Sequence, residues 1–131
     1  MASGEGSERR HFVRVNVDVP VSYKFVPLDP RMSVAQELHN GYSRNISQGG
    51  LLLIGRLPNL SWISPLLMSR MIVAVSLQLP QVQAPVKALC RAAWLETVEE
   101  KSQRAAFGLI FNEIANEDRD RVLHFVLKSQ I

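Results

Sequence analysis

The N-terminal third of the chain has the clearest alternation of hydrophobic and polar positions. From residue 13 to residue 25, every odd position holds valine, tyrosine or phenylalanine, and the positions between them are mostly polar. A period of two is typical of a β-strand with one face toward a core and the other toward water. Pro20 lies within this run and has no N–H to donate, so we predict an edge position or a break into two short strands.

Shorter alternating runs along the rest of the chain indicate more strands. We expect five of them, over residues 37–46, 51–54, 71–79, 86–95 and 104–111. Gln48, Gly49 and Gly50 would form the turn between the first two of these five. Residues 27–35 and 56–70 contain prolines and little regular pattern, so we expect loops there, with one helical turn in the longer segment.

The period changes near the C-terminus. Val122, Phe125 and Val126 fall on one face of a helix, with Asn116 as its expected N-cap and acidic residues at the next two positions, near the positive end of the helix dipole. Six short strands followed by one amphipathic helix indicate a fold dominated by β-structure. We expect a six-stranded antiparallel β-barrel with a C-terminal α-helix.

The composition is that of one domain with a sizeable core. The chain has 131 residues, of which 47% are hydrophobic, and this length suits one domain better than two. We expect residues 1–8, rich in Ser, Gly and Glu, to form a flexible tail and residues 9–131 to form the domain. No apolar run is long enough to cross a bilayer, and no secretory signal is present, so the cytoplasm is the expected compartment.

Few residues are placed for metal or catalytic chemistry. The single cysteine, Cys90, lies in an apolar strand pattern and is expected to be a small buried residue. The histidines His11, His39 and His124 lie in different segments without the spacing of metal ligands. No nucleophile–base arrangement or phosphate-binding loop is recognisable. The sequence therefore predicts a protein that is not an enzyme and that holds neither a metal nor a cofactor.

Two short polar motifs carry the functional argument. The first is Arg10-His11-Phe12-Val13-Arg14, where the tail meets the first strand, and the second is Asn45-Ile46-Ser47-Gln48-Gly49-Gly50, at a corner between two expected strands. Each motif alone is unspecific, because arginines at a strand edge are usually solvated and Asn, Ser and Gly are common at hairpin corners. Their order and spacing, on a barrel pattern that ends in a helix, resemble the PilZ domain family.

The resemblance extends from about Arg9 to about Lys128. It also includes the stretches Arg91-Ala92-Ala93-Trp94 and Phe107-Gly108-Leu109-Ile110-Phe111 in the late strands. It implies a bacterial signalling protein that binds the second messenger cyclic di-GMP. The ligand-binding residues that the resemblance implies are Arg10 and Arg14 from the first motif and Asn45, Ser47 and Gly50 from the second, with asparagine at a position where many members have aspartate.

The chemistry of these residues suits a ligand with two phosphodiesters and two guanines. Arginine can pair with phosphate oxygens through two hydrogen bonds, stack on a guanine or reach its Hoogsteen edge. Asn45 and Ser47 lie two apart on a strand and can share one face. Gly49 and Gly50 allow a tight turn and close approach of the backbone to the ligand. Arg9 would either stack on a second ligand molecule or remain a solvated charge.

The resemblance also implies how the domain would signal and which partners it would have. We expect the arginine-containing segment to change conformation when the ligand binds and to pass the signal to a protein partner, with the domain as a monomer or a ligand-linked dimer. The alternative is a PilZ-like adaptor that does not bind nucleotide. A barrel for single-stranded nucleic acid would need exposed aromatic residues among basic ones. The net charge of +3 does not require such a partner, so neither DNA nor RNA is expected.

Three other features have a structural and a functional interpretation. Trp94 could stack on a base, but its phase in the alternating apolar set predicts core packing. Arg91 is out of phase with that set, so we expect it on the outer face as a solvated charge. The apolar segment 56–70, which includes Trp62, would either cover a barrel end or form a partner surface.

Overall fold

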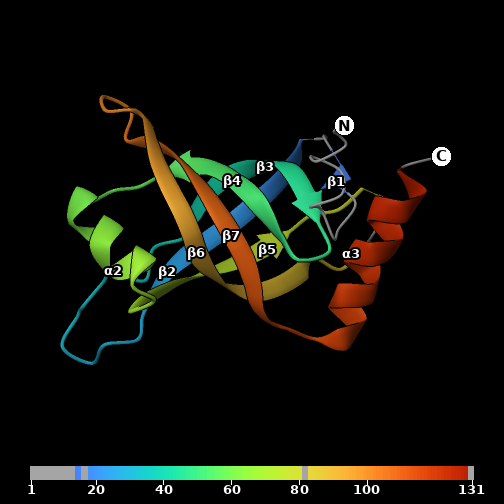
Figure 1. Ribbon diagram of the computed structural model, residues 1–131, viewed down its shortest axis with the longest axis horizontal. Coiled ribbons are helices and arrows are strands. Elements are labelled where there is room, and N and C mark those ends of the chain that lie inside the picture. Colours follow the sequence, from blue (N-terminus) through green and yellow to red (C-terminus); the bar gives the residue numbers. More distant parts are fainter. Residues whose placement is uncertain (1–13, 16–17, 81–82, 130–131) are drawn as a thin grey trace, which may run out of the picture.

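The computed structural model describes residues 14–15, 18–80 and 83–129. These residues form seven antiparallel strands (Figure 1): β1 (Arg14–Val15), β2 (Val19–Pro27), β3 (His39–Ser47), β4 (Gly50–Arg56), β5 (Met71–Leu77), β6 (Val86–Glu99) and β7 (Arg104–Ile114). They also form the 3-10 turn η1 (Leu60–Trp62) and the helices α2 (Ile63–Leu67) and α3 (Asn116–Lys128). The predicted tail, residues 1–8, and the arginines Arg9 and Arg10 lie outside the described residues.

Six of the strands close into a barrel. Around the barrel the order is β3-β2-β5-β6-β7-β4, and β4 pairs with β3 to complete the ring. Closure removes the open edges that a sheet would otherwise present. The short strand β1 adds to β3 beyond the end of β2. The predicted six-stranded antiparallel barrel with a C-terminal α-helix is confirmed.

The first strand is divided in two, but not at Pro20. After Val15 of β1, the next described pair with β3 is formed by Val19, the first residue of β2. Pro20 lies inside β2, opposite Tyr42 of β3. On its other side, β2 begins to pair with β5 only at Val21, so the missing N–H of Pro20 falls at the end of that ladder. The carbonyl oxygen of Pro20 still accepts a hydrogen bond from the backbone N–H of Gln78, at 3.1 Å.

Inward-facing side chains fill the barrel. Four alternate residues of β2 are each at most 2% exposed: Val19, Val21, Tyr23 and Phe25. The predicted alternation is therefore confirmed over residues 19–25, while the side chains of residues 13–17 lie outside the described part of the structure. The prediction for Cys90 is confirmed as well, because its side chain is fully buried and this burial raises the pKa of its thiol from 9.0 to about 12.

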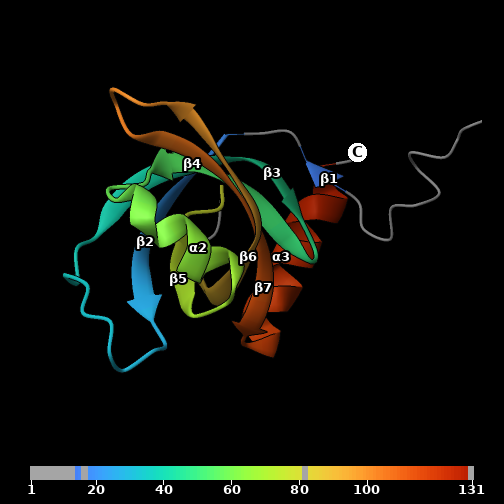
Figure 2. The same ribbon diagram turned by 60° about the vertical axis from the view of Figure 1, so that its left-hand side comes forward.

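The segment 56–70 covers one end of the barrel. Its two short helical elements, η1 and α2, lie over that end (Figure 2). Leu66 of α2 is fully buried, and the ring of Trp62 packs on Phe25 with 5.1 Å between the ring centroids. Of the two interpretations of this segment, the structure supports the barrel cover. Its outer side leaves Leu60 and Met68 more than half exposed, at 58% and 57%.

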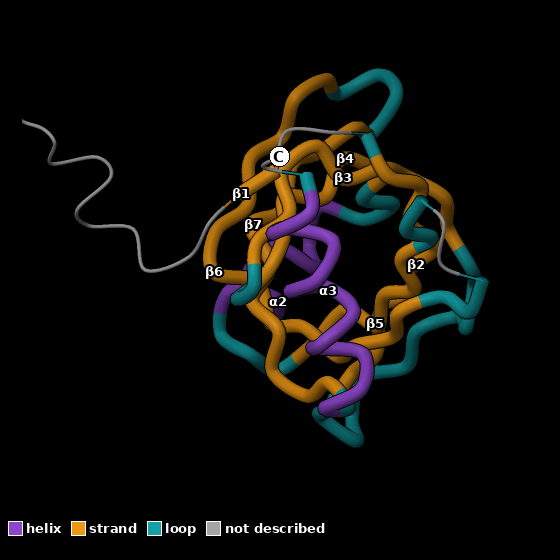
Figure 3. Tube along the Cα trace, turned by 90° about the vertical axis from the view of Figure 1, so that its right-hand side faces the viewer, coloured by secondary structure: helices purple, strands orange, loops and turns teal. Residues whose placement is uncertain are grey.

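Helix α3 packs at the opposite end of the barrel, where it crosses the ring of strands in Figure 3. Val122 and Val126 face the barrel and are at most 1% exposed, as the helical stripe predicted. Asn116 is not the N-cap, however. Strand β7 runs to Ile114, so Ala115 keeps an extended backbone and becomes the capping residue, without a side-chain hydrogen bond. No helix in the described part of the chain has the length and apolar character needed to span a membrane.

Candidate functional site

The second polar motif borders a groove where β3 ends and β4 begins. Asn45, Ser47, Gly49 and Gly50 all line this groove, which has a volume of about 590 Å³. We call it the corner groove. The rest of its lining comes from β4, β6, β7 and α3: Leu51, Leu52, Ala93, Trp94, Gly108, Leu109, Ile110, Phe111 and Arg119.

The local structure of β3 explains how two of these residues share one side. Ile46 is fully buried, so its neighbours Asn45 and Ser47 lie on the other face of the strand and border the groove. The Ser47 hydroxyl oxygen accepts a hydrogen bond from the backbone N–H of Gly49, at 3.3 Å, which holds the turn into β4. The amide of Asn45 has no hydrogen-bond partner among the described residues and is available to a ligand.

The close approach of strand β7 requires a glycine at position 50. Gly50 pairs with Ile110 of β7, and a Cβ at this position would overlap the backbone carbonyl oxygen of Leu109. No described glycine has a positive φ. The missing side chain therefore leaves space for β7, whereas the sequence suggested that it leaves space for a ligand. That the backbone at this turn approaches a ligand stays a prediction.

Trp94 lies on the outside of the barrel, and the prediction that it packs in the core is wrong. Trp94 is 47% exposed. The pairing of β6 with β7 shifts register between Ala92 and Trp94, so the strand contains a bulge there. The bulge adds one residue and turns the next side chain to the other face. The indole ring consequently lies over Gly108 of β7, where a Cβ would overlap it.

One signal in the sequence could have located this tryptophan. A glycine inside a strand often marks the place where a neighbouring group approaches closely. Gly108 lies within the strand expected over residues 104–111, and in the structure it pairs with Trp94. Gly108 thus indicates where the indole ring packs, although the periodicity of β6 alone places Trp94 on the inner face of the strand.

Arg119 is the charged residue of the groove, and no signal in the sequence indicated it. It lies in the first turns of α3, and its side chain lines the corner groove. It is the one charged residue in the described lining. Arg91 is exposed on the outer face of β6, as expected, but it does not line the groove.

The backbone of β1 joins the first motif to the second. Arg14 pairs with Ser47, and Val15 pairs with Ile46, in an antiparallel arrangement. The main chain of the last arginine of the first motif is therefore a direct neighbour of the corner groove. The roles of Arg9 and Arg10 stay predictions, because both residues lie outside the described part of the chain.

The groove combines an apolar floor, hydrogen-bonding groups, an exposed aromatic ring and a cation. Such a set suits a ligand that is both aromatic and anionic, because the ring can stack and the cation can pair with a negative group. A metal site has no comparable support: within the described residues, no group of three or more His, Cys, Asp or Glu side chains is placed to hold an ion.

Solved structures share this fold at low sequence identity. The PilZ domain of YcgR from Escherichia coli, solved with c-di-GMP, is 9% identical, with a TM-score of 0.60 over 93% of this chain and 92% of that chain. MotI/DgrA, an inhibitor of motility from Bacillus subtilis, is 20% identical, with a TM-score of 0.64 over 93% of this chain and 51% of that chain. MrkH, described as a c-di-GMP-dependent transcription regulatory factor, is 15% identical, with a TM-score of 0.64 over 92% and 50% of the two chains.

The chain therefore spans about half the length of MotI/DgrA and of MrkH. No curated protein matches the sequence significantly. A family model for the PilZ domain matches residues 8–128 and so includes both motifs, the barrel and the whole of α3. Since this match extends over nearly the whole sequence and the fold agrees with it, the chain belongs to the PilZ domain family.

Proposed function

We propose that this domain binds cyclic di-GMP in the corner groove and signals to a protein partner. PilZ domains are a family of cyclic di-GMP receptors and adaptors, and they are not enzymes. The observation that carries the proposal is the meeting of both motifs at one groove: Asn45 and Ser47 line it, and Arg14 pairs with Ser47 through the backbone.

The polar residues of β3 are suited to the guanine edge. The free amide of Asn45 offers both donors and an acceptor, so it can pair with a base edge that presents both kinds of group. The Ser47 hydroxyl accepts a hydrogen bond from the Gly49 N–H and donates one to the Gly50 carbonyl oxygen, at 3.4 Å, so it offers a ligand its remaining lone pair, for a ribose hydroxyl or a guanine N–H. These contacts would orient the ligand without supplying much of its binding energy.

The exposed indole of Trp94 supplies a surface for stacking. It is held against Gly108 and faces a groove that also contains the free Asn45 amide. Stacking of a base on an aromatic side chain contributes about 1–3 kcal/mol. A guanine of cyclic di-GMP would therefore lie on the indole, with its edge toward Asn45.

The arginines of the N-terminal segment would complete the site. Arg10 and Arg14, with Arg9 beside them, would pair with the phosphates or stack on the guanines. We propose that this segment closes over the ligand and so changes the surface offered to a partner. The coupling requires contacts made only in the closed state, because a ligand shifts an equilibrium only by its differential affinity.

Calorimetric titration of the purified domain tests the proposal. We expect heat from binding of cyclic di-GMP, a higher melting temperature with the ligand, and no comparable binding of GMP. Arg14→Ala should weaken binding, by about 1.5–3 kcal/mol for each charge-assisted hydrogen bond lost. Arg91→Ala is the matched control, since Arg91 is exposed but outside the groove. No heat and no stabilisation at high ligand excess would contradict the proposal and favour the adaptor that does not bind nucleotide.

A further inference from the structure

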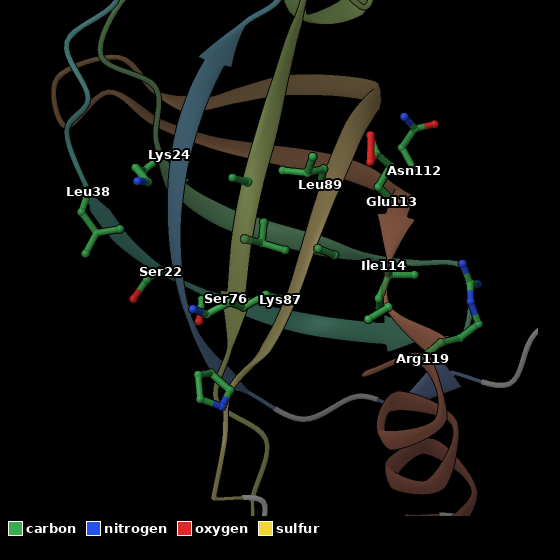
Figure 4. Close-up of a pocket in the computed structure, with 15 residues that line it drawn as sticks. Ser22, Lys24, Leu38, Ser76, Lys87, Leu89, Asn112, Glu113, Ile114 and Arg119 are labelled. Carbon is green, nitrogen blue, oxygen red and sulfur yellow. The ribbon is translucent and has the colours of Figure 1, made fainter. Parts of the chain in front are cut away.

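Arg119 borders two separate hollows on the barrel surface. One is the corner groove. The other, which we call the side groove, has a volume of about 1030 Å³ and is lined by residues of β2, β5, β6 and β7 beside the start of α3. Figure 4 shows Lys24 and Lys87 on the strands of the side groove and Arg119 at its α3 end. One long cationic side chain is thus shared by the two hollows.

The guanidinium of Arg119 is not committed to a protein partner. It makes no hydrogen bond or ion pair with any residue that the structure describes. Arg121, one half-turn further along α3, differs in this respect: its guanidinium is 2.8 Å from the carboxylate of Asp118 and 3.6 Å from that of Glu117. Of these two neighbouring arginines, only Arg119 is free to bind a ligand.

The two hollows differ in charge. Arg119 is the sole charged residue in the described lining of the corner groove. The side groove instead contains the acidic residue Glu113 and two lysines besides Arg119. A negative group in the corner groove would therefore have Arg119 as its cationic partner from the barrel side. A charge-assisted bond from arginine to phosphate is among the stronger polar contacts in proteins.

We infer that Arg119 is a further ligand-binding residue, which contacts a phosphate of the anionic ligand from helix α3. This inference rests on the proposed function and extends it to a residue outside both motifs. With the ligand bound, the side chain turns toward the corner groove and leaves the side groove. Ligand binding then changes the charge and the shape of a second surface, which adjoins Lys87 and Ile114.

Titration of arginine variants with cyclic di-GMP tests the inference. We expect Arg119→Ala to weaken binding about 10- to 100-fold, as the loss of a charge-assisted hydrogen bond predicts. Arg119→Lys should bind at an intermediate level, because lysine keeps the charge but not the planar fork. Arg91→Ala should bind as the wild type does. Equal affinity of Arg119→Ala and the wild type would overturn the inference.

The result also separates this inference from the proposed function. If Arg14→Ala abolishes binding while Arg119→Ala has no effect, cyclic di-GMP binding stands and the role of Arg119 is overturned. If the wild type does not bind, both are overturned. Circular dichroism and melting temperature confirm that each variant is folded, and Arg119 is exposed, so its truncation should have little effect on stability.

A positional measurement tests the link to the side groove. In the wild type, cyclic di-GMP should shift the backbone amide resonances of Lys87 and Ile114, which line the side groove but not the corner groove. In Arg119→Ala, saturated with ligand, these shifts should be lost. Shifts of the same size in both proteins would show that the ligand reaches the side groove by another route and would overturn the coupling through Arg119.

Discussion

The indole of Trp94 gives the corner groove its exposed aromatic surface. The ring is held on one side by Gly108, and 47% of the residue remains exposed. Side chains at the surface usually contribute little to stability. We propose that this half-exposed tryptophan, which lies beside a free amide group and an arginine, serves binding.

Replacement of Trp94 should separate binding from stability. We expect Trp94→Ala to lose about 1–3 kcal/mol of binding free energy for cyclic di-GMP, which is the worth of one base stacked on an aromatic ring. The free energy of unfolding should fall by only about 1 kcal/mol, because the ring is half exposed. Calorimetric titration and denaturant unfolding measure the two quantities.

Trp62 provides the opposite control. It packs on Phe25 at the covered end of the barrel, away from the corner groove. Trp62→Leu should therefore lower the free energy of unfolding and leave the affinity for cyclic di-GMP unchanged. A loss of affinity in Trp62→Leu equal to that in Trp94→Ala would mean that the indole of Trp94 has no specific role.

At the scale of the elements, alternation along the strands was enough to predict the barrel. Each expected strand is present, because a period of two records which face of a strand is buried. The bulge in β6 was not predictable in this way. The extra residue, Ala93, turns the side chain of Trp94 to the outer face, and the pattern of side chains before it does not indicate a bulge.

The sequence of helix α3 predicted its buried face but not its position on the barrel. Its apolar stripe predicted the buried face formed by Val122 and Val126. The position of Arg119 next to the second motif depends on where the helix lies on the barrel, which the helical period does not contain. The motifs identified the residues of the corner itself, while the residues supplied by α3 and β6 required the structure.

The N-terminal segment is the element that we propose to move. Amide hydrogen exchange across residues 7–14 should slow when cyclic di-GMP binds, because the arginines would then be held against the anionic ligand. Exchange in the buried strand β5 serves as the control and should change little. Equal protection of residues 7–14 with and without the ligand would show a preformed site, and the signal would then need another origin, such as a ligand-linked dimer.

For the whole molecule, two buried ionisable groups predict loss of stability in alkali. Burial raises the pKa of Cys90 from 9.0 to about 12, and that of Tyr23 from 10.0 to about 12. The folded state therefore keeps protons that the unfolded state loses. Their contribution to stability is complete below pH 9 and declines as the pH rises toward 12.

Denaturant unfolding at a series of pH values measures this effect. We expect the free energy of unfolding to fall above pH 9 by up to about 1.4 kcal/mol per pH unit for each group. In Cys90→Ala, which lacks the thiol, the decline between pH 9 and pH 10 should be smaller. A free energy of unfolding that is constant up to pH 11 would contradict the burial of these groups.

The central claim is that cyclic di-GMP binds in the corner groove, and the two indole N–H groups of the protein test it most directly. Trp94 lines the groove, whereas Trp62 lies at the covered end of the barrel. In a nitrogen-15 spectrum recorded during titration with cyclic di-GMP, the Trp94 indole resonance should shift with saturation while that of Trp62 stays in place. An unchanged Trp94 resonance at full saturation, or equal shifts of both, would contradict the account.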